Sequence, residues 1–174
     1  MNSQRGMTLI EVMIAMIILG VGILGVSGMQ VISLQQNRSA LFRGEATQLA
    51  NDLMDRVRVN IDVNYSALID ADPTTATSCE VNECNPVGMA AFDISQWKCS
   101  INSVDSAGDT YTACDTYGID GSLPLGAGAV ALVSGVYEVT VQWSDDRVSV
   151  LCGVRDGSVD EPPCTSITLR AQVN

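Results

Sequence analysis

The stretch MTLIEVMIAMIILGVGILGV, residues 7–26, decides how the rest of the chain is organised. It contains no Lys, Arg or Asp, and its one ionisable side chain is that of Glu11. A helix of twenty residues is about 30 Å long, which is the thickness of the hydrocarbon core of a bilayer. The stretch therefore predicts a helix that spans a membrane.

The six residues before this stretch, MNSQRG, place Gly6 directly before the apolar run. An ordinary secretory signal is cleaved after its apolar region, at a site with small residues. We find no such site after residue 26, so the sequence predicts that the apolar run stays in the mature protein. A cut at Gly6 would remove only a short leader.

The predicted helix continues to about residue 59 and has two halves. Residues 7–29 are apolar on all sides, as a membrane span is. Residues 30–59 are amphipathic, because apolar side chains recur at spacings of three and four and so share one face: Phe42, Ala46, Leu49, Leu53 and Val57. This face predicts packing against the rest of the chain rather than a cofactor site.

The apolar half contains four glycines close together: Gly20, Gly22, Gly25 and Gly28. Each Gly destabilises a helix in water by about 1 kcal/mol relative to Ala. We interpret the cluster as a surface where helices pack closely, or as a point of local melting. The alternative is that Gly is simply tolerated in membrane helices.

Residues 60–174 are predicted to form one small domain, which we call the headpiece. They contain sixteen acidic and four basic residues, a formal balance of −12. Bases are needed to neutralise phosphates, so this composition argues against nucleic-acid binding. We interpret the acidity as a solvated surface that keeps the domain soluble.

All six cysteines lie in the headpiece, which the membrane helix would place outside the cytoplasm, and this predicts disulfides. The chain contains no His, which argues against zinc binding as the alternative. Fifteen pairings are possible. Our hypothesis is pairing in sequence order: Cys79–Cys84, Cys99–Cys114 and Cys152–Cys164.

Apolar and polar residues alternate near the C-terminus, which predicts antiparallel strands at residues 137–143, 148–152 and 167–173, with a hairpin turn at 144–147. Such a sheet needs an apolar cover on one face, and the amphipathic half of the helix is the available partner. The fold class is therefore α+β. Residues 60–128 predict a loop-rich connection, with a helical turn at 89–94 and a strand at 95–101.

We find no residues that predict catalysis or a cofactor. There is no Ser/His/Asp set, no phosphate-binding Gly loop after a strand and no thiol nucleophile with a base. Two pairs of acids, Asp105 with Asp109 and Asp115 with Asp120, offer oxygen ligands for Ca²⁺. They lack the dense alternation of an EF-hand loop, so we interpret them as solvated loop acids and predict no metal site.

The junction Gly6-Met7-Thr8-Leu9-Ile10-Glu11 resembles the N-terminal signal of type IV pilins and of the related pseudopilins of type II secretion. Residues 11–30, EVMIAMIILGVGILGVSGMQ, and residues 45–66, EATQLANDLMDRVRVNIDVNYS, are similar to segments of PilV-like minor pilins. Residues 134–146, SGVYEVTVQWSDD, are similar to a late strand of the same branch. Most of the resemblance lies in the first sixty residues.

The resemblance implies a pilin fold, in which a long helix is half buried in a headpiece against an antiparallel sheet. It implies that a prepilin peptidase cleaves after Gly6 and methylates Met7, where Phe is usual. Glu11 would pair with the amine of Met7, on a neighbouring subunit or on its own chain. The alternative is a carboxylate that reaches the membrane surface without a partner.

The implied function is that of a minor type IV pilin, a structural subunit that primes pilus assembly and caps or decorates the tip of the fimbrium. Many major pilins have Pro where this chain has Gly28, which favours a minor subunit. The alternatives are a minor pseudopilin of a type II secretion system and a tip adhesin that mediates cell adhesion.

The implied partners are other minor and major pilins, the prepilin peptidase, the inner-membrane assembly platform and membrane lipid. The chain would cross the inner membrane once with a periplasmic headpiece and then enter the pilus at the cell surface. The expected parts are a leader at 1–6, a transmembrane and polymerisation segment at 7–29, an amphipathic segment at 30–59 and the headpiece.

Overall fold

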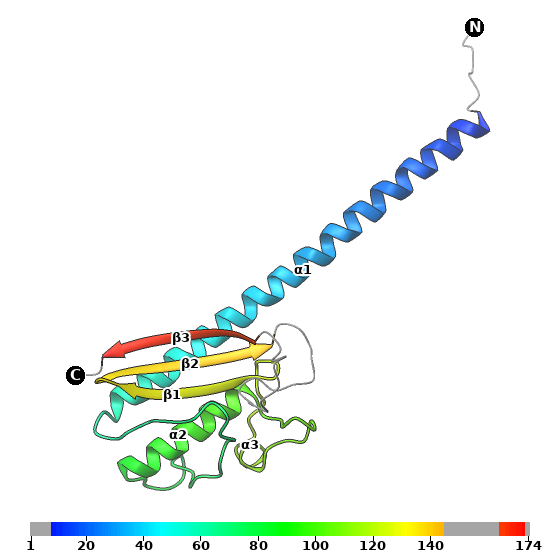
Figure 1. The fold of residues 1–174 in the computed structure, drawn as a ribbon. Helices are drawn as coiled ribbons and strands as arrows, with labels where there is room; N and C mark the ends of the chain where they lie inside the picture. Colours follow the sequence, from blue (N-terminus) through cyan, green and yellow to red (C-terminus); the bar gives the residue numbers. More distant parts are fainter. Residues whose placement is uncertain (1–7, 145–163, 173–174) are drawn as a thin grey trace. The chain divides into compact units, whose positions relative to one another are not determined.

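The computed structural model describes residues 8–144 and 164–172 (Figure 1). Their helices and strands, in chain order, are α1 (Leu9–Val59), α2 (Pro86–Ile101), α3 (Thr112–Tyr117), β1 (Ala127–Val133), β2 (Val136–Ser144) and β3 (Cys164–Gln172). The chain divides into two compact units, residues 1–40 and residues 41–174, which we describe separately.

Within the second unit, the last part of α1 supplies one wall of the core. Its buried side chains are Ala46, Leu49, Ala50, Leu53, Met54 and Val57, and Phe42 is partly buried against them. This confirms the predicted apolar face. The side chains of residues 30–36 are exposed, so burial along α1 begins later than the start of the amphipathic pattern.

The three strands form one antiparallel sheet in the order β1-β2-β3. A two-residue turn, Ser134-Gly135, joins β1 to β2 and has positive φ at both residues, 51° and 79°. Such turns match the twist of the flanking strands, and Gly adopts positive φ without strain. The side chains of β2 alternate as the sequence predicted, with Tyr137, Val139, Val141 and Trp143 buried.

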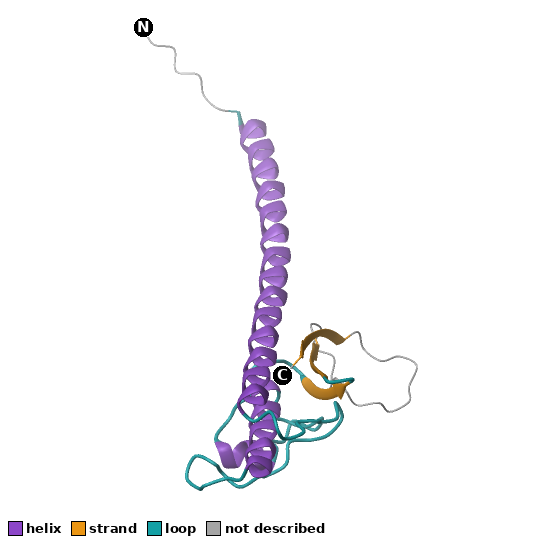
Figure 2. Cartoon of the chain, turned by 90° about the vertical axis from the view of Figure 1, so that its left-hand side faces the viewer, coloured by secondary structure: helices purple, strands orange, loops and turns teal. Residues whose placement is uncertain are grey.

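The helices of the second unit lie on one face of the sheet, as the view along the strands shows (Figure 2). The buried side chains of β2 join those of α1 in one hydrophobic cluster, to which α2 contributes Ala90, Trp97 and Ile101. The indole N–H of Trp97 donates a 2.9 Å hydrogen bond to the main-chain oxygen of Leu49 and so joins α2 to α1. This arrangement confirms the predicted α+β pilin fold.

Helix α2 includes and extends the predicted helical turn at 89–94, and it corrects the predicted strand at 95–101. Asn85 caps it, because the Asn85 side chain accepts a 2.7 Å hydrogen bond from the N–H of Gly88, and Pro86 occupies the first turn. Trp97, Cys99 and Ile101 alternate in sequence and suggested a strand. All three are buried because α2 has neighbours on two sides: the main core, and a small cluster with Cys114 of α3.

The sequence did not predict α3 or β1. Helix α3 has six residues, too few for a periodic pattern, and β1 is mostly small residues, AGAVALV, whose alternation is weak. The predicted last strand at 167–173 is observed as β3, which begins three residues earlier. The predicted turn at 144–147 extends beyond the described residues, and the predicted strand at 148–152 lies outside them.

Two disulfides join Cys79 to Cys84 and Cys99 to Cys114, as the sequential pairing predicted. Cys164 is also disulfide-bonded, and its expected partner, Cys152, lies outside the described residues. Cys99 and Cys114 are fully buried, whereas Cys79 and Cys84 are half-buried.

We expect the two disulfides to contribute unequally to stability. A closed loop of 15 residues stabilises the folded state by about 3 kcal/mol through the unfolded chain, and one of 5 residues by about 2 kcal/mol. The double substitution Cys99→Ala/Cys114→Ala also leaves a cavity in the small cluster with Ala113. It should therefore lower the melting temperature of the full-length protein in detergent more than Cys79→Ala/Cys84→Ala does. Equal shifts would contradict the burial argument.

Candidate functional site

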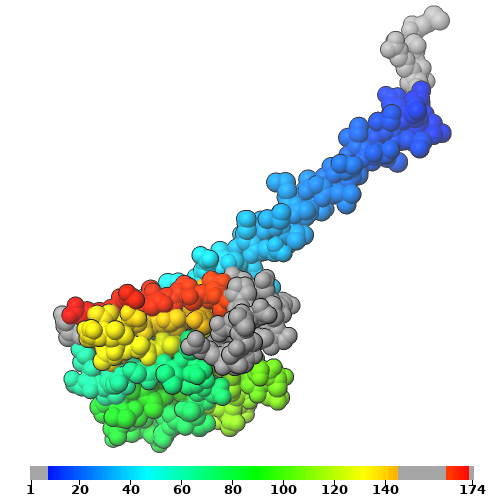
Figure 3. Space-filling view, viewed as in Figure 1, coloured from blue at the N-terminus to red at the C-terminus, as the bar shows by residue number. Residues whose placement is uncertain are grey.

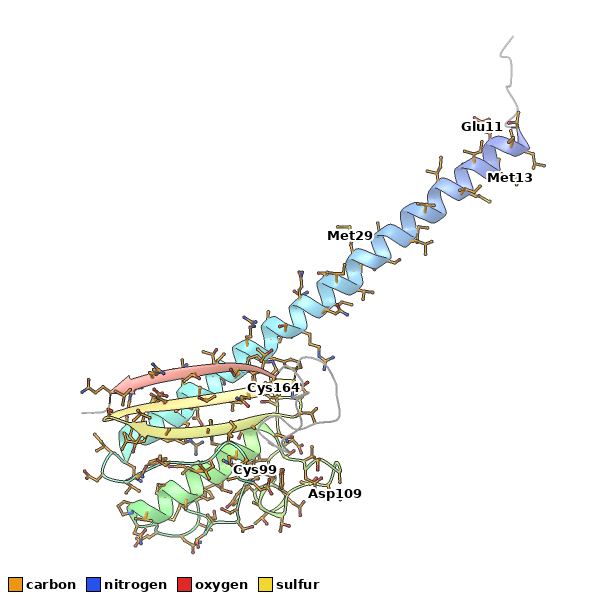
Figure 4. The ribbon with its side chains drawn as sticks, in the orientation of Figure 1. Glu11, Met13, Met29, Cys99, Asp109 and Cys164 are labelled. Atoms are coloured by element: carbon orange, nitrogen blue, oxygen red, sulfur yellow. A yellow bond between two sulfur atoms is a disulfide. The ribbon has the colours of Figure 1, made fainter. Side chains whose placement is uncertain are left out.

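Within the first unit, α1 carries a long run of exposed apolar side chains. Between Leu9 and Leu34 every large apolar side chain is exposed, from 38% for Val12 to 80% for Leu9. By length and composition, α1 is able to cross a membrane, with a mean hydropathy of 2.6 over its most apolar window and no residue of that window buried. The sticks in Figure 4 extend outward along this whole segment, including those of Met13 and Met29. Such a surface requires a lipid or protein neighbour.

Glu11 lies in the first turn of α1, and its side chain is exposed (Figure 4). Its main-chain N–H donates a 3.1 Å hydrogen bond to the oxygen of Thr8. A negative side chain at this end of a helix interacts favourably with the helix dipole. The predicted processing residues, Gly6 and Met7, lie outside the described residues.

The four glycines of the apolar half all lie within continuous helix: Gly20, Gly22, Gly25 and Gly28. A Cβ added at any of them would meet nothing within 4 Å. The Ser27 hydroxyl donates a 2.9 Å hydrogen bond to the main-chain oxygen of Ile23, one turn earlier. Neither close packing nor melting at these glycines is tested by a single chain, so both stay predictions.

The acidic loop residues do not converge. Asp105 accepts hydrogen bonds from the main-chain N–H groups of Ala107, at 2.8 Å, and Asp109, at 2.9 Å. Its carboxylate therefore stabilises the turn formed by residues 105–109. Among residues 8–144 and 164–172, no three His, Cys, Asp or Glu side chains lie close enough together to bind a metal ion. The turn gives a structural reason for Asp at position 105.

One buried lysine, Lys98, was not among the residues predicted from the sequence. The Lys98 ammonium, on α2, donates hydrogen bonds to the main-chain oxygens of Leu68, at 2.6 Å, and Ala71. The residue is only 6% exposed and lines a small cavity of about 40 Å³ with Asp72 and Tyr111. No local pattern marks Lys98 as buried, because its partners are main-chain oxygens of a loop some thirty residues earlier.

We expect this lysine to make stability depend on pH. Burial lowers the pKa of Lys98 to about 8, while Asp72 and Asp70 oppose the shift. Between pH 8 and 10 the unfolded chain therefore binds more protons, and the free energy of unfolding rises with pH, by at most about 1.4 kcal/mol per unit. Urea titrations across this range should show the rise in the wild type and not in Lys98→Met.

Two tyrosines, Tyr65, which is buried, and Tyr111, which is partly buried, reverse this rise in stability at higher pH. Burial, together with hydrogen bonds to carboxylates, raises the pKa values of Tyr65 and Tyr111 to about 12. Above pH 10 the folded state keeps protons that the unfolded chain loses, so stability falls. A flat profile between pH 8 and 10 in the wild type would contradict the assignment to Lys98.

Two models of known protein families match the N-terminal part of the chain. Residues 1–27 match the prokaryotic N-terminal methylation motif, and residues 28–95 match the family described as type IV pilin Tt1218. The two adjoining matches include the apolar helix, the amphipathic segment and the first half of α2. Searches of curated proteins and of solved structures found no match.

Proposed function

The chain belongs to the type IV pilin family, whose members are structural subunits, and on this premise we propose that it is a minor pilin that takes part in priming pilus assembly. The exposed apolar half of α1 with Glu11 as its one ionisable residue carries the proposal. A helix of this kind partitions into a bilayer and can exchange its lipid neighbours for the same helices of other subunits.

We assign the parts of the chain accordingly. The prepilin peptidase removes residues 1–6 and methylates the amine of Met7, and residues 7–29 span the inner membrane once and later enter the fibre. Residues 30–59 connect this segment to the headpiece, in which disulfides fit an oxidising compartment such as the periplasm. The glycines from Gly20 to Gly28 let this helix pack closely or melt as it leaves the lipid.

The role of Glu11 follows from its surroundings. A carboxylate in an apolar segment is costly, by up to roughly 3 kcal/mol at the centre of a membrane helix and less near an end. The methylated amine of Met7 is the cation that a neighbouring subunit can offer. Such a pair in a medium of low dielectric constant is directional and would fix the axial position of one subunit against the next.

A minor role is supported by the PilV-like residues of the first helix and by Gly28, where many major pilins have Pro. A minor pseudopilin of a type II secretion system would have the same kind of helix, so the helix alone does not distinguish these two functions. A tip position, with adhesion as its consequence, would use the headpiece.

Mass spectrometry of the chain isolated from membranes tests the processing step. We expect a mature chain that begins at methylated Met7, and an uncleaved chain when Gly6 is replaced by a bulky residue. Quantifying the chain in sheared, purified pili tests the minor role, with far fewer copies expected than of the main subunit. If the chain is processed normally but is absent from pili, the result would favour a minor pseudopilin of a type II secretion system.

A further inference from the structure

The two edges of the sheet differ. At the β1 edge, Ala67 forms a bridge with Val130, through hydrogen bonds of 2.9 Å in both directions. No described residue forms a corresponding bridge with β3, which lies at the surface along its length in the space-filling view (Figure 3, red). Edge strands with unpaired main-chain groups are templates for pairing with another chain.

The bridge at Val130 also shows which main-chain groups point outward. Val130 bonds to Ala67, so its N–H and C=O point away from β2. In antiparallel strands, consecutive residues direct these groups to opposite sides. Ala129 therefore bonds to β2, and its partner there, Thr140, directs its main-chain groups to β1.

The same alternation continues to β3. The neighbours of Thr140 on β2, Val139 and Val141, direct their main-chain groups to their partners Leu169 and Ile167. The residues between these partners face the other way. Within residues 166–172, the main-chain N–H and C=O groups at the outer edge of β3 are accordingly those of Ser166, Thr168, Arg170 and Gln172.

This edge lacks the features that proteins use to prevent pairing. Residues 166–172 contain no Pro, and their register with β2 continues without a bulge. The one charge, Arg170, is neutralised by Glu138 at 2.9 Å on the outer face of the sheet. Thr168 likewise contacts Thr140, with 3.0 Å between their hydroxyl oxygens. Both side chains therefore have partners on the sheet itself, and no described residue pairs with the main-chain groups of this edge.

The face of β3 that points toward the core is also only partly covered. Ile167, Leu169 and Ala171 pack against the core but are only partly buried, whereas Val139 and Val141 of the central strand are completely buried. A further strand beside β3 would pair the four outward residues and cover these apolar side chains, which is how strand addition combines affinity with specificity.

We propose that the edge formed by residues 166–172 accepts an extended strand from the headpiece of a different, less acidic pilin subunit. The identity of the partner rests on the proposed function. Charge excludes a second copy as the favoured occupant, because two headpieces with a formal balance of −12 each repel one another. Main-chain pairing at this edge would give the assembly a contact that is independent of the apolar helix.

Residue-resolved hydrogen exchange of the full-length chain tests this proposal, alone in detergent and co-purified with the other pilin subunits of its host. In the complex we expect amide exchange at the four outward residues to slow by about tenfold or more. Amides at 167, 169 and 171 already bond to β2 and should change less. Cross-links from the edge should lead to an extended segment of one identified pilin.

Proline substitutions separate the edge from the fold. Thr168→Pro removes an outward N–H but no bond to β2, and Thr168→Val removes the same hydroxyl while keeping the N–H. We expect about tenfold weaker association for Thr168→Pro and wild-type association for Thr168→Val. Ser166→Pro with Ser166→Ala repeats the comparison if Thr168→Pro does not fold.

The outcomes distinguish this proposal from the one on which it rests. Co-purified pilins without slower exchange at the edge overturn strand addition and leave the minor-pilin proposal intact. Failure to associate with any pilin overturns both. Protection that appears in the purified chain alone, with a dimer in solution, shows a second copy at the edge and overturns the assignment of a different subunit.

Discussion

Replacing Glu11 with Ala should leave membrane insertion and cleavage intact and reduce entry into fibres at least about tenfold. The substitution makes the apolar segment more apolar, so insertion does not suffer. It removes the only ionisable side chain of residues 7–26, and with it the partner for the amine of Met7 in the proposed assembly. A tenfold loss corresponds to about 1.4 kcal/mol, which is modest for an ion pair away from water.

The measurement is the amount of mature chain in sheared pili relative to the amount in membranes. Met13→Ala is the matched control, because Met13 is also exposed on α1, 57% by area, but carries no charge. Glu11→Gln distinguishes charge from hydrogen bonding and should behave like Glu11→Ala. Wild-type amounts of Glu11→Ala in pili would show that the carboxylate has no role in assembly.

Trp97→Ala should destabilise the second unit by about 3–5 kcal/mol, the usual cost of removing a buried aromatic side chain. Trp97 is 1% exposed and is one of the largest fully buried side chains. Its ring approaches β1 closely, because a Cβ on Gly128 would come within 2.5 Å of the ring. Its N–H donates one of the hydrogen bonds between α2 and α1, to the main-chain oxygen of Leu49. Domains typically have a total stability of about 5–15 kcal/mol, so the variant should lose a large share of its stability.

Urea unfolding of the full-length protein, followed by the fluorescence of Trp143, measures this loss. Trp97→Phe keeps most of the packing but not the hydrogen bond, and we expect a smaller cost of about 1–2 kcal/mol. Val87→Ala, at an exposed position of the same helix, should change stability by less than about 0.5 kcal/mol. A cost for Trp97→Ala similar to that for Val87→Ala would show that α2 does not depend on this contact.

Parts of the fold with a strong local period were predictable. The spacing of Ala46, Leu49, Leu53 and Val57 placed them on the face of α1 that is buried. The alternation from Tyr137 to Trp143 predicted the central strand and its buried side chains. In both cases the side-chain period matches that of the backbone, so the sequence itself indicates which side faces the core.

Secondary structure and contacts were not predictable where a helix packs against two clusters, or where its partners are distant in sequence. Residues 95–101 alternate like a strand, but Cys99 is buried through its disulfide to Cys114 and Trp97 through the main core. The polar interactions of α2 also have distant partners. Asp93 forms an ion pair with Arg56 at 3.0 Å and accepts a 2.8 Å hydrogen bond from the Tyr65 hydroxyl. Neither partner is near Asp93 in sequence.

The sequence by itself determined the apolar helix, its single carboxylate and the strands with clear alternation, because these depend on the order of neighbouring residues. The tertiary structure alone decided that α2 is a helix covering the core, that Lys98 is buried and that one edge of the sheet is bridged by Ala67 while the edge at β3 has no such bridge among the described residues. The physical reason is that these features arise from contacts between segments distant in sequence, which leave no local period.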